Sequence, residues 1–166
     1  MASAGNATLM QAAALQNPET YHVVLVCTQW NAEIVESLRS GALEVLNAAG
    51  IGRIDTLTVP GAVEIPFAIH THYRSSQPAQ AYIALACVIK GDTPHFDYVC
   101  QSITQGITLL NSQLEAPVIF GVLTVNTPQQ AHERLGGIHG HKGQEAGHAA
   151  LQMMALQQQL HPGPKP

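Results

Sequence analysis

The chain has 166 residues, of which 46% are hydrophobic and 11% are charged, with a formal net charge of -4. This length allows one compact domain, and the low charged fraction indicates burial against other subunits, because a soluble monomer's surface is usually about a quarter charged. The seven Lys and Arg residues are scattered and form no basic stripe, which argues against a nucleic-acid-binding protein.

Four apolar segments of strand length alternate with helical patterns, and they predict one domain over residues 21–160. Residues 1–20 are Ala-rich without a strong period and predict an N-terminal arm or short helix. Residues 161–166 are proline-rich and predict a frayed tail. The strands are expected over residues 22–28, 54–59, 81–89 and 118–125.

Helical spacing of apolar residues follows each strand. The first helix is expected to open at Trp30-Asn31 and the second to begin near Pro66. A third starts at Pro94, and two more start near Pro128 and Gly143. Parallel strands that alternate with helices predict an α/β fold, a flavodoxin-like three-layer αβα sandwich with a four-stranded parallel sheet whose strands are covered on both faces.

The three cysteines lie within these apolar strand and helix patterns, on faces that we expect to be buried. An odd number of buried cysteines fits reduced core residues better than disulfides or a catalytic thiol, which favours a cytoplasmic location. Residues 1–16 lack the basic start of a signal peptide, and no apolar run reaches the roughly 20 residues that span a bilayer. The cysteines are Cys27, Cys87 and Cys100.

Ligands of such sheets bind beyond the carboxyl ends of the strands, and unusual residues lie at three of these ends. Trp30, the only tryptophan, follows the first strand and could stack on a flat heterocycle or fill the edge of the core. After the second strand, Ala62, Val63 and Glu64 are expected to form an exposed loop. The sequence therefore predicts a ligand site at this edge of the sheet.

The turn after the third strand has the chemistry of a phosphate site. Asp92 or Thr93 is expected to cap the helix that starts at Pro94, and the first helical amides, beside Lys90, would face an anion. His95 adds a group that titrates near neutral pH, which suggests proton transfer on a phosphorylated substrate. Caps of this kind also begin many helices that bind nothing, so the turn alone leaves both readings open.

A second candidate anion site is the glycine-bearing stretch of residues 134–145. Arg134 could grip a phosphate through two N–H groups or could simply be solvated. The stretch lacks the G-x-x-x-x-G-K-[ST] pattern, and residues 50–52 lack the third glycine of a dinucleotide fingerprint, so ATP and NAD are disfavoured. A metal is disfavoured as well, because the chain lacks H-E-x-x-H and C-x-x-C motifs. The histidines near this stretch are His132, His139, His141 and His148.

Taken together, these segments resemble the 6,7-dimethyl-8-ribityllumazine synthase family, over residues 21 to about 158. Four motifs and a fifth segment occur in the family's order and at its spacing, which makes the resemblance highly specific. They are TQWN at 28–31, PGAVEIP at 60–66, IKGDTPH at 89–95, PVIFGVLT at 117–124 and RLGGIHGHKGQE at 134–145.

The resemblance implies a transferase of riboflavin biosynthesis. The family condenses 5-amino-6-ribitylamino-2,4(1H,3H)-pyrimidinedione with 3,4-dihydroxy-2-butanone 4-phosphate and releases phosphate and water. It needs neither a metal nor an organic cofactor, and its partners are these small molecules and copies of the same chain, with riboflavin synthase as the pathway neighbour. A flavin-binding shell or storage protein of the same fold is the alternative, and a flavodoxin-like electron carrier is a more distant one.

Within the site, the resemblance assigns the ring and the ribityl chain to the ends of the first two strands. Trp30 matches the aromatic residue that stacks on the pyrimidine, where many bacterial members have Phe, and relatives with Trp can bind riboflavin. Ala62, Val63 and Glu64 match the residues that contact the ring and the ribityl chain.

The resemblance assigns the phosphate to Asp92 and Thr93, beside Lys90, which stands where many relatives carry Arg. His95 matches the residue proposed to transfer protons. Three further residues match residues that the neighbouring subunit contributes to the site. Two of them flank the pyrimidine ring and its polar edge, and the third is the arginine that binds the phosphate. These three are Phe120, Lys142 and Arg134.

A site shared between subunits implies a homo-oligomer. The family forms pentamers, some of which close into icosahedral shells of sixty subunits. Members that stay pentameric often carry an insertion between the arginine and the lysine of the last segment, and Arg134 to Lys142 shows no extra residues. We therefore expect a homopentamer that can close into a 60-mer.

Overall fold

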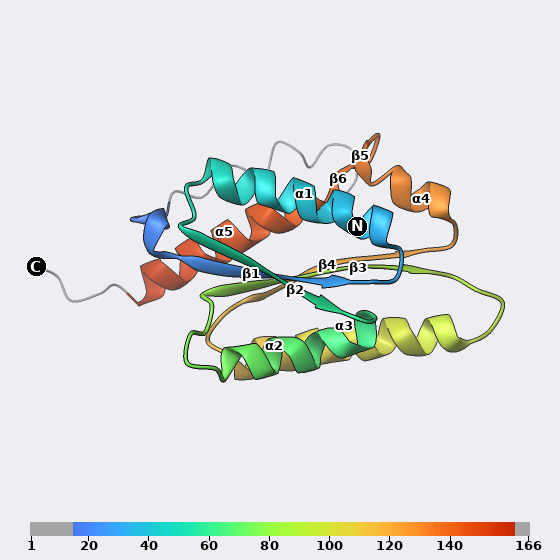
Figure 1. The fold of residues 1–166 in the computed structure, drawn as a ribbon, viewed down its shortest axis with the longest axis horizontal. Helices are drawn as coiled ribbons and strands as arrows, with labels where there is room; N and C mark the ends of the chain where they lie inside the picture. Colours follow the sequence, from blue (N-terminus) through green and yellow to red (C-terminus); the bar gives the residue numbers. More distant parts are fainter. Residues whose placement is uncertain (1–14, 162–166) are drawn as a thin grey trace, which may run out of the picture.

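The computed structural model describes residues 15–161, and its centre is a four-stranded parallel sheet in the order β2-β1-β3-β4. Figure 1 shows this sheet between two helical layers, with α1 and α5 on one face and α2 and α3 on the other. The predicted α/β three-layer fold is confirmed. The N-terminal arm was expected over residues 1–20 and the frayed tail over residues 161–166, and of these only 15–20 and 161 lie within the described part. The strands are β1 (His22–Thr28), β2 (Arg53–Val59), β3 (Ala81–Ile89) and β4 (Val118–Val125).

The helices and short elements complete the chain. The main helices are α1 (Ala32–Ala48), α2 (Ile65–Tyr73), α3 (His95–Gln113) and α5 (Lys142–Leu160). Within residues 15–161, no helix is long and apolar enough to cross a membrane. The short elements are the 3-10 helices η2 (Pro18–Thr20) and η3 (Ala62–Glu64), the helix α4 (Pro128–His132) and the two-stranded hairpin of β5 (Leu135–Gly137) and β6 (Gly140–His141).

Alternate residues of the central strands face the two helical layers, so the sheet divides the core in two. On β1, Leu25 points into the core beneath α1 and α5, whereas Val24 and Val26 point into the core above α2 and α3. All three side chains are fully buried. Burial of one such side chain contributes about 1.5–3 kcal/mol, and β1 is buried along its whole length, so it anchors both layers.

The expectation that every strand is covered on both faces is wrong for β2 and β4, the two strands at the edges of the sheet. On β2 only Val59 is buried, and on β4 Phe120 and Thr124 are exposed. The apolar run of residues 118–125 has the composition of a central strand, because an exposed Phe120 reads the same as a buried one in a sequence.

The helices α1 and α5 pack at unusually short range because α5 carries glycines on the contact face. A Cβ atom at Gly143 would collide with the backbone carbonyl oxygen of Leu38, and one at Gly147 would lie 3.0 Å from the Cβ of Val45. Only glycine allows the backbones to approach this closely. The helical spacing of apolar residues predicted after the first strand is confirmed in α1, where the apolar residues at this spacing are buried: Ile34, Val35, Leu38, Ala42, Val45 and Leu46.

The cysteines Cys27 and Cys87 lie in the core, as predicted, and burial raises the pKa of each thiol to about 11. Cys100, which was also expected on a buried face, is only partly buried. Burial nevertheless raises the pKa of its thiol. A thiol with a raised pKa is a poor nucleophile, because the thiolate is the reactive form.

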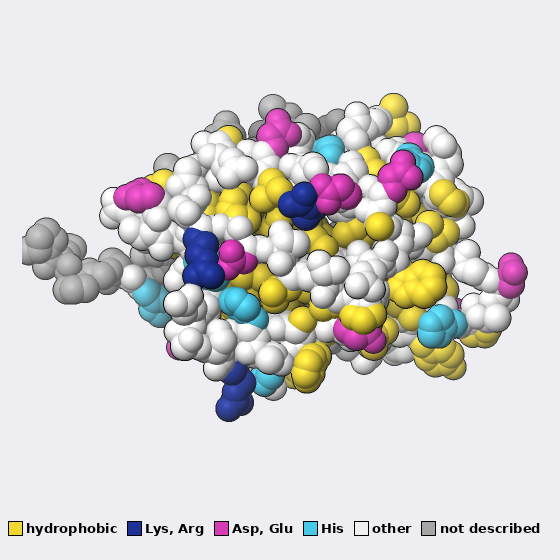
Figure 2. Space-filling model, in the orientation of Figure 1, with side chains coloured by type: hydrophobic (Ala, Val, Ile, Leu, Met, Phe, Trp, Pro, Cys, Tyr) yellow, Lys and Arg dark blue, Asp and Glu magenta, His cyan; other side chains and the backbone are white. Residues whose placement is uncertain are grey.

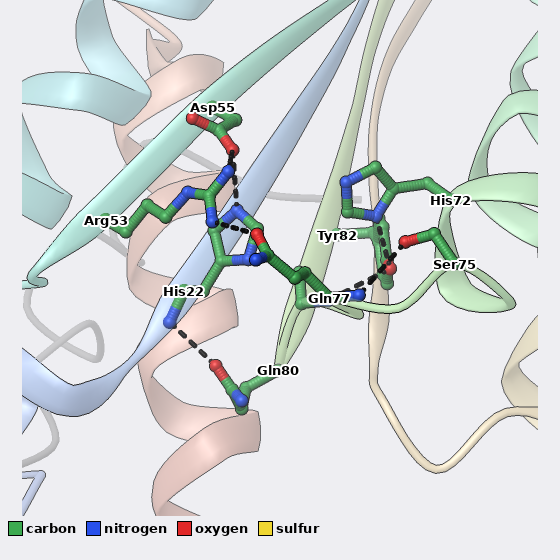
Figure 3. Close-up of polar contacts among 9 residues, drawn as sticks. His22, Arg53, Asp55, His72, Ser75, Gln77, Gln80 and Tyr82 are labelled. Atoms are coloured by element: carbon green, nitrogen blue, oxygen red, sulfur yellow. Dashed lines mark hydrogen bonds and ion pairs between the residues drawn. The ribbon is translucent and has the colours of Figure 1, made fainter.

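A polar cluster joins β1, β2, β3 and α2 at the amino-terminal end of the sheet (Figure 3). The carboxylate oxygen Oδ2 of Asp55 lies 2.7 Å from an Arg53 nitrogen and 3.0 Å from Nε2 of His22. The neighbouring ring of His72 lies with its centroid 5.9 Å from that of His22, and its Nδ1 is 2.9 Å from the hydroxyl of Tyr82. The Arg53 guanidinium is the main cause of a lowered pKa for the Asp55 carboxyl.

Candidate functional site at the carboxyl edge of the sheet

The ends of β1 and β2 bring the predicted ring-binding residues together, as parallel pairing requires. The backbone nitrogen of Trp30 lies 3.4 Å from the carbonyl oxygen of Pro60, where β2 has ended. A Cβ atom at Gly61 would lie 3.5 Å from Cδ1 of Trp30 and 3.1 Å from Oε2 of Glu64, so both side chains flank this glycine. The indole is 74% exposed, which excludes the reading of Trp30 as part of the core edge of this chain.

The segment after β2 is more ordered than predicted. Residues 62–64 form the 3-10 helix η3 instead of an exposed loop, and α2 follows directly from Ile65, one residue before the predicted start. Ala62 is buried beneath the sheet edge, whereas Val63 and Glu64 are exposed. A short 3-10 turn at the start of an α-helix is common, and here it fixes which side chains face outward.

The turn after β3 is exposed along its whole length, from Lys90 to His95. Its entry is fixed by the Lys90 backbone N–H, which donates to the carbonyl of Val125 at 2.8 Å. The expected side-chain cap is wrong: α3 begins at His95 with Pro94 in the cap position, and no side chain of the described chain caps it. Asp92 and Thr93 are therefore not engaged at the helix start, and the first amides of α3 have no side-chain acceptor.

A second group of predicted residues lies on β4 and around the β5–β6 hairpin. Phe120 is 42% exposed on β4. The guanidinium Nη1 of Arg134 donates to the carbonyl of Gln130 at 2.7 Å, and Nζ of Lys142 forms an ion pair with Glu145 at 2.6 Å. Among residues 15–161, no hydrogen bond or ion pair joins this second group to Trp30 or Glu64.

The hairpin between Arg134 and Lys142 was not predicted. The backbone N–H of Lys142 donates to the carbonyl of Arg134 at 2.9 Å, which closes the hairpin and sets both cationic residues at its base. Positive φ angles at Gly136 and Gly140 make the reversal possible. The glycines at 136, 137 and 140 were the available signal, but we read them as a possible anion loop.

Two contacts of residues at or beside the predicted site were missed. Glu145 stands three residues after Lys142, a spacing that places the two on one helix face. Asn31 was read only as the opening of α1, yet its side chain reaches the carbonyl of Cys87 on β3. The three-residue spacing could have revealed the contact of Glu145. No sequence signal could have revealed the contact of Asn31, because it joins residues that lie 56 positions apart.

The histidines of the last segment are dispersed. Nδ1 of His141 accepts from the backbone N–H of Gln144 at 3.4 Å and caps α5, while Nδ1 of His148 is buried without a hydrogen-bond partner. Within residues 15–161, no three His, Cys, Asp or Glu side chains come together in a group that could hold a metal ion.

Comparison with known proteins agrees with the motif pattern. The family model described as 6,7-dimethyl-8-ribityllumazine synthase matches residues 20–158. A protein of that name from Porphyromonas gingivalis is 45% identical over 135 residues, covering 80% of this chain and 83% of the relative. The counterpart from Phocaeicola vulgatus is 41% identical over 146 residues, covering 87% and 86%, and that from Bacteroides fragilis is 43% identical over 132 residues, covering 78% and 92%. The chain therefore belongs to the 6,7-dimethyl-8-ribityllumazine synthase family, transferases of riboflavin biosynthesis.

Proposed function

We propose that this chain condenses 5-amino-6-ribitylamino-2,4(1H,3H)-pyrimidinedione with 3,4-dihydroxy-2-butanone 4-phosphate to give 6,7-dimethyl-8-ribityllumazine, phosphate and water. One observation carries the assignment of the site: an exposed indole, an exposed carboxylate and an exposed, uncapped helix start follow successive strands at one edge of a parallel sheet. They are Trp30, Glu64 and the start of α3 at His95.

The pyrimidine ring is proposed to stack on Trp30, with Val63 and Glu64 beside the ring and the ribityl chain. An exposed indole offers a flat apolar face to a heterocycle. Glu64 lies next to the same glycine as the indole, so its carboxylate can accept hydrogen bonds from the hydroxyl groups of a substrate that stacks there. The buried Ala62 offers its backbone only.

The butanone phosphate is proposed to bind at the turn after β3. The uncapped amides at the start of α3 favour an anion, and the exposed Lys90 adds a full positive charge. Asp92 and Thr93 line this turn. Arg134 from a neighbouring copy supplies further donors, because its contact with Gln130 uses only one of its N–H groups.

His95 is the proposed proton carrier of the reaction. Attack of the 5-amino group on the ketone, loss of water to form the imine, loss of phosphate and ring closure each move a proton. An exposed imidazole in the first turn of α3 adjoins the proposed phosphate turn, where the leaving group departs. It can therefore accept and return protons while the turn holds the phosphate.

The site is proposed to be completed by a second copy, in a homopentamer that can close into a 60-mer. Large apolar side chains stand exposed on α2 and α3, with Phe67 at 76%, Tyr98 at 69% and Leu109 at 56% exposure. Figure 2 shows hydrophobic side chains exposed across the visible face, with acidic and basic groups scattered among them. Phe120 and Lys142 would face the pyrimidine bound to the adjacent copy. The chain would act in the cytoplasm, and riboflavin synthase would consume the lumazine.

The test is to mix the purified protein with both substrates and to follow lumazine absorbance and fluorescence against an enzyme-free control. Acceleration over that control is expected. No acceleration, together with tight riboflavin binding, would instead favour a flavin-binding shell or storage protein of the same fold.

A further inference from the structure

Asn31 holds an unusual backbone conformation at the edge of the site. Its φ of 57° and ψ of 43° are left-handed, and only one other non-glycine residue among residues 15–161 has a positive φ. Left-handed backbone is uncommon outside glycine, and the surrounding structure must hold it in place.

The side chain of Asn31 makes a contact that can hold this conformation, and the contact reaches the neighbouring strand β3. It stands at the N-cap of α1 but does not cap the helix. Its Nδ2 donates instead to the carbonyl oxygen of Cys87, at 2.8 Å. The β1–β3 ladder ends where Cys27 faces Leu85, so the amide of Asn31 extends the link between the two strands beyond their last backbone pair.

Trp30 stands directly before Asn31 in the sequence. Its indole is 74% exposed, so packing within the chain does little to orient it. Its backbone is tied on two sides: the nitrogen faces the Pro60 carbonyl at 3.4 Å, and the carbonyl accepts from the Thr28 hydroxyl at 3.2 Å. The hydrogen bond from the Asn31 side chain to β3 is a third restraint on this backbone, and it acts on the direction in which the chain leaves β1.

We propose that Asn31 is a positioning residue that sets the orientation of the Trp30 indole through its hydrogen bond to the Cys87 carbonyl. The role in substrate binding rests on the proposed function, in which the pyrimidine stacks on Trp30, whereas the orientation of the indole does not.

Two variants separate the hydrogen bond from the backbone conformation. Asn31→Gly accepts a positive φ without strain but removes the amide, and Asn31→Asp keeps the shape of the side chain but replaces the donor with a carboxylate that would face a carbonyl. Asn111→Ala is the matched control: Asn111 likewise bridges to backbone, with bonds of 2.8 Å to the carbonyl and the nitrogen of Val118, but at the opposite end of the sheet.

Fluorescence anisotropy is the first readout, and it reports on Trp30 alone because the chain has a single tryptophan. Both Asn31 variants should lower the anisotropy and raise the KM for the pyrimidinedione on the order of tenfold, with the KM for the butanone phosphate nearly unchanged. A tenfold change is what a hydrogen bond of about 1.4 kcal/mol would give. Asn111→Ala should change neither quantity.

Wild-type anisotropy in both Asn31 variants would overturn the proposal, and so would an equal effect of Asn111→Ala. A rise in both KM values together would also overturn it, since that marks general loosening of the edge. Should the wild-type protein form no lumazine, the proposed function fails, while the anisotropy of the variants still decides whether Asn31 orients Trp30.

Discussion

The hydroxyl of Tyr82 lies 2.9 Å from Nδ1 of His72 and 3.2 Å from the backbone nitrogen of Ala79. Because the Ala79 N–H donates to the hydroxyl oxygen, the fully buried Tyr82 needs an acceptor for its own proton. Nδ1 of His72 provides that acceptor only while it carries no proton. The contact therefore selects the neutral form of His72.

Stability should fall in mildly acidic solution because of this contact. Burial, and next the neighbouring His22, lower the pKa of His72 below its ordinary value of 6.5. The unfolded chain therefore takes up a proton at a higher pH than the folded chain, so the stabilisation is complete above about pH 6.5 and declines as the pH falls below it. Thermal unfolding between pH 8 and pH 5 should show this decline.

In that measurement, His72→Gln should flatten the decline, because the Gln carbonyl can accept from Tyr82 without titrating. His70→Gln is the control: His70 is exposed in the same helical turn and contacts none of these groups. An unchanged slope for His72→Gln would contradict the assignment.

Arg134→Ala should raise the KM for the butanone phosphate about ten- to a hundredfold and leave the KM for the pyrimidinedione nearly unchanged. A charge-assisted contact to phosphate contributes about 1.5–3 kcal/mol. Arg39→Ala is the control, since Arg39 pairs with Glu36 on α1 and has no proposed role. Equal changes in both KM values would refute the phosphate contact.

His95→Ala should slow turnover by about ten- to a thousandfold while the protein stays folded. The imidazole is exposed, so its loss leaves no cavity, and part of the condensation proceeds once the substrates are aligned. Steady-state rates and circular dichroism together check this. A variant as fast as the wild type would show that His95 transfers no proton in the reaction and only begins α3.

Riboflavin should quench the fluorescence of Trp30 along a saturable curve, because a flavin ring can stack on the indole as the pyrimidine is proposed to do. Trp30→Phe should keep most of the synthase activity, since Phe also offers a flat face, whereas Trp30→Ala should raise the KM for the pyrimidinedione. Quenching that rises linearly with riboflavin would indicate collision in solution and would exclude a flavin site.

Gly143→Ala should destabilise the fold by about 1–3 kcal/mol, the usual cost of overpacking, because the new methyl group would meet the Leu38 carbonyl. Gly91→Ala should change stability by less than about 0.5 kcal/mol, because nothing lies within 4 Å of the new atom. Chemical denaturation of both variants measures the difference. Equal stabilities would show that α1 and α5 can separate at little cost.

Sequence patterns predicted the sheet well because its strands are apolar runs with clear ends. The bounds of β1, β3 and β4 were predicted to the residue, and β2 begins at Arg53, one residue early. Helix starts were less accurate, since α3 begins without the side-chain cap that Asp92 or Thr93 offered. Whether a side chain caps a helix depends on the path of the chain between the strand and the helix, and the residue types in the turn do not reveal that path.

The arrangement of the site was only partly predictable. The rule for parallel sheets placed Trp30 and the segment after β2 together, and they do meet at Gly61. The bond from Asn31 to the Cys87 carbonyl depends on three-dimensional register and has no local signal. The roles of Phe120, Arg134 and Lys142 came from the family resemblance alone, because residues from a second copy leave no periodic pattern in one chain.

The polar cluster and the proposed catalytic edge lie at opposite ends of the same strands. The seven residues of β1 separate them, a distance of roughly 20 Å at about 3.3 Å per residue. Charges that far apart are largely screened at physiological ionic strength, where the Debye length is about 8 Å. Protonation of the polar cluster, which lowers stability in acid, is therefore electrostatically separate from the proposed catalytic edge, and either end of the sheet can be changed by mutation without disturbing the other.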